Sequence, residues 1–167
     1  MVEVQLSAVQ VDLQTKNPVV LLQEREGART LPIFIGPAEA RAIALVLEGH
    51  VPERPLTHDL IRDLLGSLSA RLERLVITEL RDKTYLAEMH LDVKGEAVVV
   101  SCRPSDGIAV ALRTQTRMYV DDDLIEAEGI VLQADSEDED DLEAEEPEEL
   151  VEHFREFIQA VRPEDFA

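Results

Sequence analysis

The chain has 167 residues, of which 45% are hydrophobic and 31% charged, and its formal net charge is -20 at pH 7. This length suits one domain with its own core, and the apolar content excludes a fibrous or wholly disordered chain. The longest apolar run, from Ala42 to Leu47, is far short of the roughly 20 residues of a membrane-spanning helix.

The N-terminal part alternates between apolar and polar residues, as a half-buried strand does. Val2 to Leu13 predicts a first strand, in which a change of apolar parity near Ala8 indicates a β-bulge. Val19 to Gln23 predicts a second strand, and a turn around Gly27 connects it to a third over Thr30 to Ile35.

Two helices are expected next. Gly36-Pro37 predicts the start of the first helix, which ends before Gly49. After a Pro-interrupted segment, Thr57 is a good N-cap for the second helix. An apolar stripe at helical spacing is expected to face the core, and it comprises Leu60, Ile61, Leu64, Leu65 and Leu68.

The middle of the chain predicts a hairpin, a further strand, a third helix and a short returning strand. They cover residues 70–81 and 84–93 about Arg81-Asp82-Lys83, then Ala97 to Cys102, Gly107 to Arg113, and Met118 to Val120. Asp121-Asp122-Asp123 favours a cap for a helix over Leu124 to Glu128 rather than a cation site. Runs of strands separated by helices predict an α+β fold whose mixed, largely antiparallel sheet carries flanking helices.

The negative charge is concentrated near the C-terminus. Residues 1–134 hold 14 basic and 21 acidic residues, whereas residues 135–149 hold 11 acidic residues and no base. We expect a domain over 1–134 and a solvated, disordered acidic linker over 135–149, with competition for a basic groove as the alternative. Residues 150–167 regain helical spacing and predict an amphipathic helix that packs on its own core, a sister subunit or a foreign partner.

The compartment predicted from the sequence is the cytoplasm. Glu3 lies where a secretory signal would carry basic residues. The one cysteine, Cys102, has no second cysteine with which to form an internal disulfide, as suits a reducing environment.

No strong motif for a known reaction is present, but two polar blocks lie where loops enter predicted helices. Arg54-Pro55-Leu56-Thr57-His58-Asp59 combines an arginine, a histidine and a carboxylate, which suits phosphate binding with acid–base or metal chemistry. The alternative is a helix start in which Thr57 caps, Asp59 complements the helix dipole and His58 lies on the surface.

The second block is Arg103-Pro104-Ser105-Asp106. Here an arginine is suited to clamp a phosphate while Asp106 binds a hard cation. The alternative is again structural: Ser105 or Asp106 caps the helix, and Arg103 pairs internally with a carboxylate. Glu39 and Arg41 lie in the first turns of the first helix and point away from each other, so they need not share a site.

Three blocks in order resemble the bifunctional nuclease family. They are Pro32-Ile33-Phe34-Ile35-Gly36 followed by Glu39, Arg54-Pro55-Leu56-Thr57-His58-Asp59-Leu60, and Arg103-Pro104-Ser105-Asp106-Gly107-Ile108-Ala109. The resemblance covers roughly residues 3–134, with Cys102 and Gly107 departing from the residues more usual in the family. It implies an α+β fold, dimers or larger homo-oligomers, and nuclease activity on DNA and RNA.

Phosphodiester cleavage generally needs carboxylates that hold Mg²⁺ or Mn²⁺, a base for water and cations for the developing charge. Our hypothesis is therefore that Asp59, Asp106 and Glu39 serve the metal chemistry, with Asp59 and Asp106 as its ligands. His58 assists proton transfer, while Arg54, Arg103 and Ser105 bind phosphate. The alternative is a non-catalytic, oligomeric binding or assembly module whose polar motifs are structural.

Overall fold

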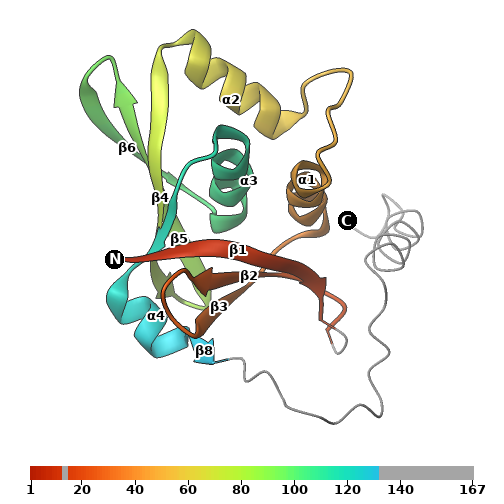
Figure 1. Ribbon diagram of the computed structural model, residues 1–167, viewed down its shortest axis with the longest axis vertical. Helices are drawn as coiled ribbons and strands as arrows, with labels where there is room; N and C mark the ends of the chain where they lie inside the picture. The colour runs from red at the N-terminus through yellow and green to blue at the C-terminus, as the bar shows by residue number, and fades with distance from the viewer. Residues whose placement is uncertain (13–14, 132–167) are drawn as a thin grey trace. The chain divides into compact units, whose positions relative to one another are not determined.

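The computed structural model describes residues 1–12 and 15–131 (Figure 1). In chain order the elements are β1 (Val2–Val11), β2 (Pro18–Glu24), β3 (Arg29–Phe34), α1 (Pro37–Leu47), α2 (Thr57–Ser67), β4 (Ala70–Arg81), β5 (Thr84–Val93), β6 (Glu96–Cys102), α3 (Pro104–Thr114), β7 (Met118–Val120), α4 (Asp122–Glu128) and β8 (Ile130–Val131). The predictions for the acidic linker and for the C-terminal helix lie outside the described residues.

The strands form one mixed sheet in the order β6-β5-β4-β7-β1-β2-β3-β8. The β4–β7 pair is parallel, and the other neighbouring pairs are antiparallel. The predicted α+β class with a largely antiparallel sheet is therefore confirmed. None of the helices in the described residues has the length and apolar character needed to cross a bilayer.

Local sequence signals place the bulge and the central hairpin. The pairing of β1 with β2 shifts between Leu6 and Ala8, next to the predicted bulge. Asp82 and Lys83 join β4 to β5, and both have positive φ, as a type I′ turn requires. Such a turn matches the twist of the flanking strands, so the hairpin lies where predicted.

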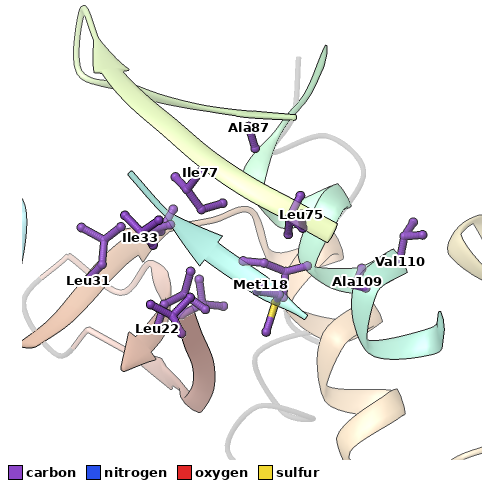
Figure 2. Close-up of a cluster of buried hydrophobic side chains, with 14 of the residues drawn as sticks. Leu22, Leu31, Ile33, Leu75, Ile77, Ala87, Ala109, Val110 and Met118 are labelled. Carbon is purple, nitrogen blue, oxygen red and sulfur yellow. The ribbon is translucent and has the colours of Figure 1, made fainter. Parts of the chain in front are cut away.

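The core lies between the helices and one face of the sheet. One buried cluster contains Leu22 and Ile33 from the β2–β3 hairpin, Leu75 and Ile77 of β4, and Ala109 of α3 (Figure 2). Because α3 is buried along most of its length, both of its ends are fixed relative to the sheet. That rigidity matters because polar residues cluster around its first turn.

The second helix differs from its prediction in two ways. Its N-cap is Leu56 rather than Thr57, because the Asp59 carboxylate accepts a 3.0 Å hydrogen bond from the Leu56 amide and so satisfies the helix start. The predicted apolar stripe is also divided between two environments. Ile61 and Leu65 pack on the core, whereas three leucines of the stripe are exposed: Leu60, Leu64 and Leu68.

The remaining differences concern element boundaries. The third helix begins at Pro104 rather than at Gly107, since the proline ring sets the backbone for a first helical turn. The expected aspartate cap of α4 is confirmed, because the Asp121 side chain accepts a hydrogen bond from the Asp123 amide. The two-residue strand β8 has no counterpart in the prediction.

Candidate active site

Polar side chains from three separate helix starts meet in one cluster. His58 Nε2 lies 3.2 Å from Asp106 Oδ1, and Arg103 Nε donates a 2.8 Å hydrogen bond to Asp106 Oδ2. Arg103 Nη1 also lies 2.9 Å from Glu39 Oε1, so one guanidinium links two carboxylates. We call Glu39, His58, Arg103 and Asp106 the junction cluster.

Each member of the junction cluster is held by the first turn of a helix. Glu39 lies in the first turn of α1, His58 in that of α2 and Asp106 in that of α3, where Arg103 is the N-cap. At Gly36, a Cβ would collide with the Glu39 carboxylate, so glycine lets this carboxylate fold back over the helix start. The positive ends of three helix dipoles therefore point toward one region, which favours anions there.

The electrostatics of the junction cluster keep Asp106 ionised. Burial raises the pKa of the Asp106 carboxyl, but hydrogen bonds from Arg103 and His58 outweigh this effect and hold the pKa below its usual value. Arg103 is 67% exposed, whereas the His58 side chain is nearly covered. The cluster thus combines the accessible guanidinium of Arg103 with the more buried pair of Asp106 and His58.

Asp59 is engaged differently from its neighbour His58. Its Oδ1 accepts a 2.7 Å hydrogen bond from Arg113 Nε, and its Oδ2 caps the amide of Leu56. Burial raises the pKa of Asp59, but the contacts with Arg113 and Leu56 bring it below the usual value. Both oxygens of the proposed metal ligand therefore already have partners inside the protein.

Arg113 is the polar residue that sequence reasoning missed. Its guanidinium also donates to the carbonyl oxygens of Ala109 and Ala42, so it links α1, α2 and α3. A basic residue in the last turn of a helix is ordinarily explained by the helix dipole, and nothing in the sequence connects it to Asp59.

Two of the predicted phosphate-binding residues lie apart from the ion pairs of the cluster. Arg54 is exposed in the loop before α2, and Ser105 is buried in the first turn of α3 next to Asp106. Their roles stay predictions.

The junction cluster contains carboxylate oxygens, which are donors that a hard divalent cation would take. In the described part of the chain, no group of three or more His, Cys, Asp or Glu side chains is placed to hold a metal. Mg²⁺ often uses only one or two carboxylates, with water and substrate phosphate completing its shell. Asp106 and Glu39 supply two carboxylates of this kind, both in contact with Arg103.

Known proteins are similar to this chain over the part that carries the junction cluster. A family model described as "Bifunctional nuclease domain" matches residues 20–133. The chain is 41% identical over 164 residues to "Uncharacterized protein Rv1829" of Mycobacterium tuberculosis strain H37Rv, which covers 98% of this chain and 97% of that protein. It is also 23% identical over 118 residues to "Bifunctional nuclease 2" of Oryza sativa subsp. japonica, covering 68% of this chain and 36% of the rice protein.

Proposed function

The chain belongs to the bifunctional nuclease domain family, and from this premise we propose that it binds nucleic acid and hydrolyses phosphodiester bonds in DNA and RNA with a divalent metal. The observation that carries the proposal is the junction cluster. Three motifs far apart in the sequence bring a carboxylate, an imidazole and an exposed guanidinium within hydrogen-bond distance. We place the reaction in the cytoplasm.

Arg103 is the residue that binds the scissile phosphate. Its guanidinium is exposed, and its planar fork matches two phosphate oxygens. The helix starts around it add backbone dipoles of the same sign. Arg54 and Ser105 extend this anion site along the loop and the first turn of α3.

His58 transfers the proton. Its imidazole is held against Asp106 by the 3.2 Å contact, which fixes the orientation of the ring. His58 would take a proton from the attacking water and return one to the leaving oxygen. The paired carboxylate supplies the orientation, as second residues commonly do for catalytic histidines.

Asp106 and Glu39 would hold the divalent metal, Mg²⁺ or Mn²⁺. When bound, such an ion neutralises charge on the phosphoryl oxygens and lowers the pKa of a coordinated water. Arg103 contacts the same two carboxylates, so a cation held by them would leave its guanidinium available for the substrate phosphate. For Asp59 to join the ligands, it would first have to leave Arg113.

The test is cleavage of labelled DNA and RNA by the purified full chain with Mg²⁺, Mn²⁺ or chelator. Asp106→Asn should abolish metal-dependent cleavage, whereas Asp63→Asn should retain it, because Asp63 pairs with Arg62 on the exposed surface of α2. His58→Ala should also lose activity. Cleavage that is unchanged in both Asp106→Asn and His58→Ala would point to a contaminating nuclease and remove the proposal.

A second candidate function is a non-catalytic binding or assembly module. It is favoured by one observation: Arg103 already neutralises the carboxylates of Glu39 and Asp106, as in a structural ion-pair network. This candidate predicts nucleic-acid binding or self-association without cleavage under any metal. Replacing Asp106 by asparagine would then lower stability and leave binding intact.

A further inference from the structure

Strand β6 is an edge of the sheet, and no other described residue covers its apolar surface. It pairs with β5 on one side and stands at the end of the strand order. Residues 96–101 are all exposed, and Val99 at the centre is 53% exposed, with Val98 and Val100 exposed on either side of it. An exposed aliphatic edge strand is a template for pairing with another chain.

The devices that normally protect a sheet edge are missing from β6. Natural edges carry prolines, lysines or bulges that prevent pairing with another chain. The sequence EAVVVSC contains none of these residues, and its register with β5 is unbroken from Glu96 to Cys102. The opposite edge, β8, has only two residues.

The direction of the free backbone groups follows from the β5–β6 turn. Lys94 and Gly95 form a two-residue turn with positive φ, so the closing pair Val93–Glu96 is of the hydrogen-bonded kind. Pairs alternate from there along an antiparallel ladder. Three residues of β6 therefore direct N–H and C=O to the open edge: Ala97, Val99 and Ser101.

We propose that a second copy of this chain pairs with β6 in antiparallel orientation, about a twofold axis at Val99. This register places the outward groups of Val99 opposite those of the partner's Val99, and those of Ala97 opposite those of the partner's Ser101. Every outward N–H and C=O is then satisfied. The only charged residue of the strand, Glu96, faces the partner's Cys102, so no like charges meet.

The geometry favours a second copy through a closed interface. A twofold contact uses the same strand on both subunits, so it ends with two chains. A head-to-tail contact would pair β6 with β8, which is too short to match it. On the helix-facing side, Val98 and Val100 lie beside Leu91 and Met89, so pairing would also extend the apolar layer across the axis.

The first test is sedimentation equilibrium of the full chain and of Val99→Lys. Opposed lysines at the axis should raise the dimer dissociation constant by about 100-fold, since like charges placed opposite each other across an interface strongly disfavour association. Val131→Lys is the matched control, because Val131 is equally exposed on the opposite edge, and it should dimerise as the unmodified chain does. A monomeric unmodified chain, or a dimer unaffected by Val99→Lys, would overturn the proposal.

A second variant separates pairing from folding. Val99→Pro removes an N–H that points away from β5, so the fold should persist while the dimer is lost. In the unmodified chain, amide exchange at Ala97, Val99 and Ser101 should slow as concentration rises, whereas the neighbouring amides that bond to β5 should not change. Concentration-independent exchange at those three amides would contradict the interface.

Discussion

Arg113 Nε donates a 2.7 Å hydrogen bond to Asp59 Oδ1 across 54 positions of sequence, and the side chains are only 3% and 10% exposed. The pair fastens the start of α2 to the end of α3. Because His58 precedes Asp59 on α2, the same contact fixes where the imidazole lies relative to Asp106. A buried ion pair thus supports the junction cluster without belonging to it.

Removing Arg113 should destabilise the protein strongly. Arg113→Ala would leave the Asp59 carboxylate buried and without its counter-charge, a change that typically costs about 3–5 kcal/mol. Urea denaturation at neutral pH measures this cost. Arg117→Ala is the control: Arg117 is exposed and 3.7 Å from Glu3, so its loss should matter by less than about 1 kcal/mol. Equal effects of the two substitutions would refute the role given to Arg113.

Stability should fall at acid pH through Asp59 and Asp106. Both carboxyls have a pKa below the usual value in the folded protein. Their contribution is therefore fully present above the unfolded pKa of about 3.9, and it is lost as pH falls through the folded values. Urea denaturation between about pH 5 and pH 2 should show this loss.

The variant Asp59→Asn should flatten that acid dependence, because the amide does not titrate. Asp63→Asn serves as the comparison, since Asp63 is exposed and pairs only with its neighbour Arg62. If the slope of stability against pH is the same in Asp59→Asn as in the unmodified chain, the Arg113 contact is not what depresses the Asp59 pKa.

The parts of the fold that depend on local chemistry were predictable from the sequence. The turn at Asp82-Lys83 and the helix start at Gly36-Pro37 follow from neighbouring residues, and both lie where expected. The division of the α2 stripe did not follow, because helical spacing alone does not say which leucines meet the sheet. Leu60 and Ile61 are adjacent in sequence, yet only Ile61 packs on the core.

The candidate site was predictable in composition but not in pairing. Helix starts with Glu39, His58 and Asp106 are visible in the sequence, since each follows a turn signal. Which carboxylate meets which cation depends on how α1, α2 and α3 pack. Asp59 and Asp106 were assigned the same metal, whereas tertiary packing gives Asp59 to Arg113 and Asp106 to Arg103 and His58.

Arg103 should compete with a divalent ion for the carboxylates of Glu39 and Asp106. Replacing it by alanine would remove the guanidinium from both carboxylates, so Mn²⁺ binding to the full chain should tighten by about 10-fold, the effect of roughly 1.4 kcal/mol. Calorimetric titration with MnCl₂ measures this affinity. Arg54→Ala should leave it unchanged, because Arg54 makes no ion pair within the described residues. Weaker binding in Arg103→Ala would place the metal elsewhere.

Gly107 should be intolerant of alanine, although it lies inside a helix. A Cβ there would collide with Leu75 Cδ1, which is fully buried, and would lie 3.1 Å from Cys102 Sγ. Overpacking a core costs about 1–3 kcal/mol, more than the roughly 1 kcal/mol that alanine gains over glycine in a helix. Gly107→Ala should therefore lower the free energy of unfolding.

Gly66 supplies the matched control, because it lies in α2 and nothing stands within 4 Å of its Cβ position. Gly66→Ala should raise the free energy of unfolding by about 0.5–1 kcal/mol. In a Leu75→Val background, where the obstructing Cδ1 is gone, Gly107→Ala should become neutral or stabilising. A penalty for Gly107→Ala that persists in that background would show that Leu75 is not its cause, and urea denaturation of the four variants decides the point.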